Sequence, residues 1–297
     1  MILIVDDDNT VRLSLSVLLR REGCESTGVS TPAEALAAIR ENPGIRLVVM
    51  DMNFSRSTSG EEGIELLRQD AKEKGKELWF FGLLPTEKAW LEANYPGEFT
   101  YTASRDDAEY IYEADKLMTY AGKKLHGKRN HVNKFKALHG DNWSYETITE
   151  DNLEECFQMA LKWRNLNGCE DDEEKNSEMC VTLNSLRLYK ELNLIGGLLR
   201  VGDEIVAFTI GEAVNDDTFV VHIEKAYADI EGAYTMINQQ FVEHEIAGKY
   251  KYTNREDDVG EEGLRKAKLS YKPVFMVEKG VVTLKEDSEK ECAKDDI

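Results

Sequence analysis

Residues 254 to 273 form a dense run of charged and polar side chains between two regular elements of this 297-residue chain. Tyr250 and Tyr252 alternate with polar residues before the run, as in a half-buried strand, and the residues from Gly260 to Leu269 have helical spacing. The charged residues therefore fall on a strand-to-helix turn. Turns held by a rigid scaffold commonly carry functional residues.

Length and composition set broad limits on fold and location. With 297 residues, 41% hydrophobic and 32% charged, the chain is long enough for two domains with separate cores. A formal net charge of -20 argues against nucleic acid or an anionic membrane as the main partner, although a local basic patch is compatible with it. No apolar run reaches the roughly 20 residues that span a bilayer, and the acidic N-terminus does not resemble a signal peptide. We expect a cytoplasmic protein with reduced, structural cysteines.

The first third of the chain alternates short apolar strands with amphipathic helices. Strands are predicted at 2–5, 26–29 and 47–50, and helices at 10–21, 32–41 and 63–68. This alternation predicts a parallel, doubly wound sheet. Ligands bind at the carboxyl ends of such strands, where Asp6, Asp7 and Asp51 fall. We expect these carboxylates to cluster, to bind Mg²⁺ and to present Asp51 as a phosphoryl acceptor.

Two motifs in this part resemble the receiver domain of two-component response regulators. They are Ile-Leu-Ile-Val-Asp-Asp-Asp at 2–8 and Leu-Val-Val-Met-Asp-Met-Asn-Phe at 47–54, followed by a loop similar to that of some sigma-54-dependent regulators. The resemblance covers residues 2 to about 68 and implies a flavodoxin-like fold. It also implies Asp51 as the phosphoacceptor, Asp6, Asp7 and Asp51 with the backbone carbonyl of Asn53 as metal ligands, and a histidine kinase as partner.

The receiver pattern is incomplete beyond residue 68. Strands at 78–84 and 98–102, with a helix at 86–94, can complete the sheet in shape. Thr86 can supply the hydroxyl of the fourth strand, but the fifth strand ends near Arg105 without the lysine that contacts the phosphoryl group in that family. This departure favours a receiver-like scaffold that does not switch.

Four ordered motifs in the rest of the chain resemble the double-GNAT-like proteins related to the C-terminal domain of phosphatidylglycerol lysyltransferases. They lie at 123–135, 216–226, 232–234 and 254–273, within a resemblance that covers residues 71 to 280. In that family a complete first GNAT-like half precedes the second, whereas here the receiver-like segment replaces most of it. The sequence thus predicts a fusion or chimera, natural or engineered, with the family switch near 69–71.

The predicted fold class is α/β, with a receiver-like doubly wound parallel sheet followed by a GNAT-like mixed α+β domain. The predicted domains are a receiver-like hybrid at 1–105, a GNAT-like acyltransferase domain at 106–280 and a charged, disordered tail at 281–297. Strands at 194–201, 204–212 and 218–225, joined by tight turns, predict an antiparallel meander. A helix at 233–247, a strand at 251–253, a helix from 260 and a strand at 274–279 complete a GNAT-like order.

Gly232, Ala233 and Tyr234 lie where the helix after the meander begins. In GNAT folds the amides of this helix start face the acyl donor. The Gly-x-Gly/Ala signature of ordinary acetyl-CoA users is absent, which disfavours acetyl-CoA. The donor that the resemblance implies is an unusual one, an acyl-CoA or an aminoacyl-tRNA.

Glu224, at the end of the strand at 218–225, is the candidate general base, because a carboxylate there can accept a proton from an amine. The alternative is a structural ion pair with Lys225 or Arg255. His222, on the same face as Glu224, fits a hydrogen-bonded interior histidine better than a catalyst.

The polar run itself supplies further candidates. Asn254 and Glu256 would share one strand face, with Arg255 on the other, which gives one site face and one bracing face. Arg265 and Lys268, three residues apart on a helix, can meet one anionic group or form a solvated basic face. We expect the end of the strand that carries Glu224, the helix start at Gly232 and this turn to line one cleft.

A basic segment at 117–140 has six lysines or arginines and no acidic residue. Lys128 and Arg129 are its candidates for contact with a donor or an anion. The segment can meet the phosphates of a tRNA or a lipid headgroup, or pair with the chain's own Asp257 and Asp258.

Two hypotheses follow. The first is a transferase that moves an acyl or aminoacyl group onto an unknown amine, lipid or small-molecule acceptor through positioning and oxyanion stabilisation. The second is a non-catalytic signalling or scaffold protein with a Mg²⁺-binding, receiver-like half. Mass spectrometry of products formed from acyl-CoAs and aminoacyl-tRNAs would separate them.

Overall fold

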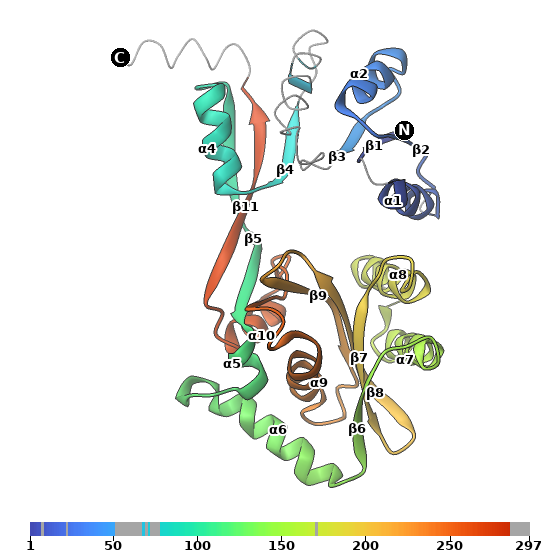
Figure 1. Ribbon diagram of the computed structural model, residues 1–297, viewed down its shortest axis with the longest axis vertical. Helices are drawn as coiled ribbons and strands as arrows, with labels where there is room; N and C mark the ends of the chain where they lie inside the picture. The colour runs from blue at the N-terminus through green and yellow to red at the C-terminus, as the bar shows by residue number, and fades with distance from the viewer. Residues whose placement is uncertain are drawn as a thin grey trace. The chain divides into compact units, whose positions relative to one another are not determined.

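The computed structural model describes residues 1–6, 9–21, 23–50, 67–68, 71, 78–169 and 172–285 (Figure 1). The chain divides into two compact units. The first comprises residues 1–81, 88–101 and 281–297, and the second residues 82–87 and 102–280. The domain boundaries predicted at 105 and 280 stay predictions.

The first unit contains a three-stranded parallel sheet in the order β2-β1-β3. Its elements are β1 (Ile2–Val5), α1 (Asn9–Arg21), β2 (Ser26–Val29), α2 (Pro32–Glu41) and β3 (Leu47–Met50). Thr31 caps α2 by accepting a hydrogen bond from the backbone of Glu34, and Leu3, Val5 and Ile39 are buried in a small core. The bounds predicted for these strands and for α2 are confirmed. The sheet is parallel, as the alternation of strands and helices predicted, and its assignment to a flavodoxin-like fold stays a prediction.

The remaining strands belong to a second sheet, in the order β4-β11-β5-β10-β9-β8-β7-β6. They are β4 (Trp79–Leu83), β5 (Phe99–Glu113), β6 (Trp143–Thr147), β7 (Ile195–Val201), β8 (Glu204–Ala213), β9 (Thr218–Ala226), β10 (Tyr252–Asn254) and β11 (Phe275–Leu284). The expectation that the strands at 78–84 and 98–102 complete the parallel sheet is therefore wrong for the described residues. β5 continues through the buried residues Tyr110, Ile111 and Tyr112, and its residues 111–113 pair with β10 in antiparallel orientation rather than with a parallel neighbour.

β11 also corrects the predicted tail. The closing strand was expected at 274–279, but it extends to Leu284, so residues 281–284 lie in a strand. The side chain of Val282 is buried, and this burial accounts for the extension.

In the second unit the predicted antiparallel meander is confirmed by the pairing of β7 with β8 and of β8 with β9. β9 then pairs with β10 in parallel, but only as far as Val220 and Asn254. The end of β9, residues 221–226, continues beyond this pairing. The two strands therefore part at the level of the strand-to-helix turn that follows β10.

Helices cover both faces of this sheet (Figure 1). α7 (Leu153–Leu166) and α8 (Glu173–Arg187) lie on one face, and α9 (Ala233–Phe241), extended by a π-helical turn (Val242–Ile246), lies on the other. α6 (His126–His139) packs against α9, after α5 (Ala114–Thr119) and a short 3-10 helix (Lys123–Leu125). α10 (Glu262–Ser270) precedes β11, and α4 (Pro85–Asn94) precedes β5. Phe208, Phe219, Phe241 and Phe135 are fully buried between these layers.

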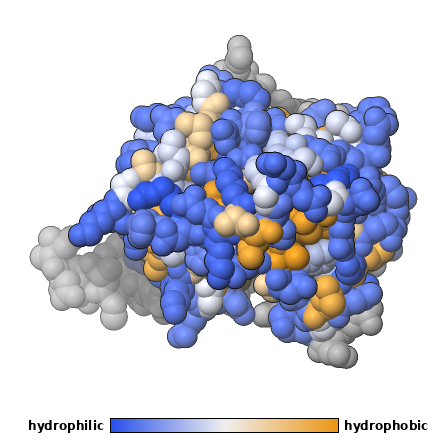
Figure 2. All heavy atoms as spheres, turned by 90° about the horizontal axis from the view of Figure 1, so that it is seen from below, coloured by the Kyte–Doolittle hydropathy of each residue, from blue (hydrophilic) through white to orange (hydrophobic). Residues whose placement is uncertain are grey.

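The surface seen in Figure 2 is largely hydrophilic, with smaller hydrophobic areas, as expected for a chain with 32% charged residues. Among the helices that the structure describes, none is both apolar and long enough to cross a membrane.

Candidate functional site

A buried ion pair joins β9 to the turn after β10, at the point where the two strands part. Nη2 of Arg255 donates to Oε1 of Glu224 at 2.8 Å, and each side chain is 11% exposed. Of the two partners that the sequence left open for Glu224, the structure selects Arg255. Lys225 instead pairs with Glu178 of α8 and lies over the ring of Trp163.

A hydrogen bond from Asn238 of α9, itself held by Tyr120 just after α5, fixes the carboxylate of this pair. Nδ2 of Asn238 donates to Oε2 of Glu224 at 3.1 Å, and the hydroxyl of Tyr120 donates to Oδ1 of Asn238 at 2.8 Å. Asn238 and Tyr120 are almost completely buried. Both carboxylate oxygens are therefore occupied, and Glu224 is oriented to hold Arg255.

Aromatic rings enclose the guanidinium of Arg255. Its Cζ lies 4.6 Å from the ring centre of Tyr271 and 6.0 Å from that of Tyr112. Burial disfavours the charged guanidinium, but the charge of Glu224 outweighs it and the pKa of Arg255 stays above its ordinary value. Burial also raises the pKa of both tyrosines. Nη1 of Arg255 is buried and has no hydrogen-bond partner among the described residues.

Two lysines approach this cluster from different helices. Nζ of Lys128, on α6, lies 3.5 Å from the ring centre of Tyr271. Nζ of Lys268, on α10, donates to the backbone carbonyl of Arg255 at 2.6 Å and to that of Asp257. Burial, and then the neighbouring charge of Arg255, lower the pKa of each lysine to about 8. Perturbed pKa values of this kind cluster at functional sites.

The turn that carries Arg255 has an uncommon backbone. Glu256 (φ 55°), Val259 (φ 44°) and Gly260 (φ 81°) all have left-handed φ angles. For a β-branched residue such as Val259 this conformation is costly and persists only where surrounding contacts impose it.

Asp258 supplies those contacts. Its side chain is fully buried and accepts hydrogen bonds from Nε (3.0 Å) and Nη2 (2.6 Å) of Arg265, from the backbone of Gly260 (3.1 Å), from Nη1 of Arg105 (3.2 Å) and from the hydroxyl of Tyr110. The hydrogen bonds from Arg265 hold the pKa of Asp258 well below its usual range, against the effect of burial. We call Asp258, Arg265, Arg105, Tyr110 and Gly260 the Asp258 clamp. It fixes the turn that presents Arg255 to Glu224.

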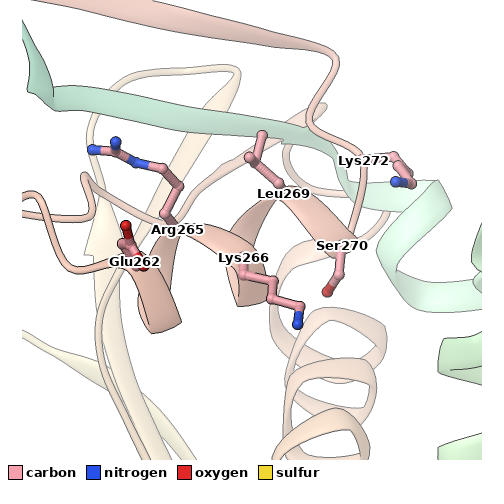
Figure 3. A pocket seen from close by; sticks show the side chains of 6 residues that line it. All are labelled: Glu262, Arg265, Lys266, Leu269, Ser270 and Lys272. Atoms are coloured by element: carbon pink, nitrogen blue, oxygen red, sulfur yellow. The ribbon is translucent and has the colours of Figure 1, made fainter.

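The predicted meeting of Arg265 and Lys268 at one anionic group is not seen. Arg265 belongs to the Asp258 clamp, whereas Lys268 binds backbone carbonyls. A shallow groove of about 570 Å³ runs along α10. Among the side chains that line it, Arg265 and Lys266 extend in different directions (Figure 3). The groove is lined by Glu262, Arg265, Lys266, Leu269, Ser270 and Lys272.

Asn254 and Glu256 do not share a strand face, because β10 ends at Asn254 and Glu256 turns into the left-handed region. Oδ1 of Asn254 accepts from the backbone of Glu256 at 2.8 Å. The carboxylate of Glu256 lies 2.6 Å from Nδ1 of His222, whose Nε2 lies 3.0 Å from Glu212. His222 is hydrogen-bonded as predicted but not interior, since its side chain is 33% exposed on the outward face of β9.

The helix start at Gly232 faces α6. A Cβ atom at Gly232 (φ 84°) would lie 2.5 Å from the carbonyl oxygen of His131 and 3.2 Å from Cβ of Phe135, so close helix packing explains the glycine. Ala233 is buried and Tyr234 is 37% exposed. Arg129 donates to the carbonyls of Tyr120 and Gly122 and thus closes the connection between α5 and α6.

The predicted magnesium site falls largely outside the described residues. Asp7, Asp51 and Asn53 lie there, and the expectation that they cluster stays a prediction. Asp6 lies just after β1, where its backbone carbonyl accepts from Arg12 at 2.6 Å. In the part of the chain that the structure describes, no group of three or more His, Cys, Asp or Glu side chains is arranged to hold a metal ion.

Comparisons with known proteins now bear on this geometry. The sequence profile of the family described as phosphatidylglycerol lysyltransferase, C-terminal, matches residues 10–282. The match starts within the part predicted to be receiver-like, and the resemblance to receiver domains stays a prediction. An uncharacterized protein of Mycoplasmoides gallisepticum is 28% identical over 207 residues, which are 69% of this chain and 64% of that protein. The chain thus spans less than two thirds of that relative's length.

Three solved structures are similar. A conserved protein of unknown function from Bacteroides thetaiotaomicron is 40% identical over 77% of each chain, with a TM-score of 0.72. The C-terminal domain of a putative lysylphosphatidylglycerol synthetase from Agrobacterium fabrum is 11% identical over 81% of this chain and 78% of that one, with a TM-score of 0.58. L-PGS from Bacillus licheniformis is 16% identical over 82% and 77% of the two chains, with a TM-score of 0.52. The last two show a shared fold.

Proposed function

Because the chain belongs to the phosphatidylglycerol lysyltransferase C-terminal family, we propose that it transfers an acyl or aminoacyl group from an activated ester or thioester to an amine or hydroxyl acceptor. The observation that supports this most directly is the Glu224–Arg255 pair between the parting strands, with Nη1 of Arg255 left without a partner among the described residues. The GNAT-like order of elements supports a donor site in this part of the sheet.

Arg255 is the group that acts on the donor. As the acceptor attacks the donor's carbonyl carbon, negative charge develops on the carbonyl oxygen, and a fixed N–H donor stabilises that charge. Losing one such donor costs about 3 kcal/mol of transition-state stabilisation, or roughly a hundredfold in rate. Glu224 holds Arg255 in place, which is a different role from the general base predicted from the sequence.

The basic segment at 117–140 supports an anionic donor or acceptor. Lys123 and Lys124 are exposed beside the start of α6, and Lys128 extends over Tyr271. An aminoacyl-tRNA or an acyl-CoA presents phosphates that such residues attract. Because the family description names phosphatidylglycerol lysyltransferase, a lysyl donor and phosphatidylglycerol are the first substrates to test.

The parallel order β2-β1-β3 favours a second, separable role for the first unit. We infer a receiver-like scaffold that binds Mg²⁺ through Asp6, Asp7 and Asp51 without switching. Chemical shifts that respond to Mg²⁺ but stay unchanged when a phosphoryl analogue is added would support this. No response to Mg²⁺ would contradict it.

The transfer reaction is tested by mass spectrometry of products formed from lysyl-tRNA or acyl-CoAs with phosphatidylglycerol vesicles or amines. We expect Glu224→Gln and Arg255→Lys to lower the rate at least about a hundredfold. Glutamine keeps the shape of Glu224 but offers one acceptor oxygen in place of two, so either Arg255 or Asn238 loses a hydrogen bond. We therefore expect the free energy of unfolding of Glu224→Gln to fall by about 1 to 3 kcal/mol.

Glu155→Gln is the matched control, since Glu155 also pairs with an arginine, Nη1 of Arg200 at 2.8 Å, but is 52% exposed. The control should transfer at the wild-type rate. Full activity of Glu224→Gln would contradict the assignment of the site, and absence of product with every donor would favour the scaffold hypothesis.

A further inference from the structure

Lys128 differs from the other cations near the proposed site. It is the third residue of α6, is partly buried, and has no ion pair in the part of the chain that the structure describes. Its ammonium lies over the ring of Tyr271 at 3.5 Å. On the same helix, Lys134 pairs with Glu231 at 2.6 Å, and Arg129 binds two carbonyls. Lys128 thus meets an aromatic ring next to a guanidinium rather than a carboxylate.

Three features disfavour the charged form of Lys128. Its side chain is partly removed from water, so the ammonium is incompletely solvated. The guanidinium of Arg255 lies 4.6 Å from the centre of the same Tyr271 ring. The first turn of α6 contains no acidic residue, so the positive end of the helix dipole is not compensated.

Other groups near Lys128 act in the opposite sense. The ring face of Tyr271 attracts an ammonium. The charge of Glu224 also favours the ammonium, but that carboxylate is already paired with Arg255. Lys268, the other cation beside Arg255, binds carbonyls. The net effect is that burial, followed by Arg255, lowers the pKa of Lys128 to about 8.

We propose that Lys128 is itself an acyl acceptor, a nucleophilic amine that reacts with activated acyl esters or thioesters at the proposed transfer site. The lone pair of the uncharged Nζ attacks the carbonyl carbon. The N–C bond forms, the C–S or C–O bond to the leaving group breaks, and the departing thiolate or alkoxide takes the proton that the nitrogen loses. The product is an amide on Lys128, which removes a cation beside Arg255 and thereby lowers the affinity of the site for an anionic donor.

The experiment measures acylation of the full chain by a small thioester, N-acetylcysteamine S-acetate, from pH 6.5 to 10.5. Peptide mass spectrometry gives the rate at each lysine, with free N-α-acetyl-lysine as reference. We expect half-maximal reactivity of Lys128 near pH 8 and of the reference near pH 10.4. At pH 7.5 Lys128 should react faster than Lys134 of the same helix. The pH midpoint reports the protonation of the amine. Restricted access of the thioester to Lys128 would therefore slow the reaction without shifting the midpoint.

A midpoint near 10.4 would overturn the proposal, as would an absence of label on Lys128 at every pH. Lys128→Arg should abolish label at this position and leave the label at Lys134 unchanged. Lys124→Glu, at an exposed residue just before α6, compensates the helix terminus and should lower the rate at pH 7.5 about two- to fivefold. An unchanged rate in that variant would contradict the electrostatic origin of the reactivity and so the proposal.

The proposal rests on the proposed function only for the activated acyl donor. The labelling reaction needs neither tRNA nor an external acceptor, so its failure and the failure of transfer are distinguishable. Labelled Lys128 without transfer would support a reactive amine in a protein of another function. Transfer with an unlabelled Lys128 would support the transferase and reject self-acylation.

Discussion

Two carboxylate–guanidinium pairs each have one member on the turn after β10, Arg255 in one and Asp258 in the other, and the pairs differ in how completely their hydrogen-bonding groups are satisfied. Asp258 receives five hydrogen bonds from the other members of the Asp258 clamp. In the Glu224–Arg255 pair the carboxylate is also satisfied, by Arg255 and Asn238, but Nη1 of Arg255 has no partner among the described residues.

This difference distinguishes a structural role for the Asp258 clamp from the proposed catalytic role of the Glu224–Arg255 pair. A saturated buried network has no capacity for a ligand and contributes rigidity. In the cluster around Arg255, a buried N–H donor without an acceptor and two lysines of lowered pKa destabilise the folded state. A bound substrate can reduce this destabilisation by accepting the hydrogen bond or by pairing with the lysines. The clamp stabilises the left-handed turn at Glu256 and Val259, and the turn holds Arg255. The two pairs should therefore respond differently to substitution.

The largest effect is expected at the clamp. Asp258→Asn leaves Arg265 and Arg105 without their buried carboxylate and should lower the free energy of unfolding by about 3 kcal/mol in urea denaturation at pH 7. The pKa of Asp258 is depressed in the folded state, so its contribution is present above pH 4 and is lost as the pH falls further. The variant should lack this acid-sensitive part of the stability curve.

Asp106→Asn is the control, because Asp106 binds the same arginine at 2.6 Å but is 57% exposed. Its effect should be within about 1 kcal/mol. Equal losses for the two variants would show that the clamp is no more important than a surface pair.

A good part of this fold was predictable because its signals are local. Short strand-like segments that alternate with amphipathic helices set the bounds of β1, β2 and β3, and tight turns set the meander of β7, β8 and β9. The length of β5 was not predictable, because the residues at its end, Ile111 to Glu113, pair with β10 more than 100 residues later. Pairing at that separation leaves no local pattern.

The candidate site likewise contains residues that the sequence identified and residues that it did not. The sequence identified the turn and named Arg255 as one of two partners of Glu224, because both lie at strand ends. It did not identify Asn238, Tyr120 or Tyr271, since apolar spacing assigns such residues to a helix face or a core. It also did not identify Asp258 as a clamp. Asp258 lies in the turn before α10, outside the helix that carries Arg265, so helical spacing gave no signal for this pair.

We expect a smaller loss in the free energy of unfolding when Arg255 of the Glu224–Arg255 pair is replaced by another cation. Arg255→Lys removes the planar fork and one contact to Glu224, but a lysine can still reach the carboxylate. We expect a loss of about 1 to 2 kcal/mol, less than for Asp258→Asn, measured under the same conditions. A loss larger than that of the clamp variant would reverse the comparison and make Arg255 a mainly structural residue.

At Lys128 we expect a substitution to stabilise the protein rather than to destabilise it. Its pKa is lower in the folded than in the unfolded chain, so the charged form opposes folding below pH 8, and the penalty disappears as the pH rises towards 10.4. Lys128→Met should raise the free energy of unfolding at pH 7 by about 1 kcal/mol, after allowance for the lost contact with the ring of Tyr271. The gain should vanish near pH 10. A destabilised variant at pH 7 would place Lys128 among the structural residues.

The smallest effect is expected at His222, which links the same turn to β9 from the exposed side. Burial opposes the charged imidazolium, but the hydrogen bonds and charges of Glu256 and Glu212 outweigh it and raise the pKa of His222. A raised pKa means that the stabilisation is present below about pH 6.5 and is lost as the pH rises through the folded value. His222→Gln should therefore cost about 0.5 kcal/mol at pH 5.5 and nothing at pH 9, since partly exposed ion pairs contribute little. Denaturation at the two pH values measures it. A cost that persists at pH 9 would mean that His222 holds Glu256 through neutral hydrogen bonds, and the turn would then depend on two supports rather than on the Asp258 clamp alone.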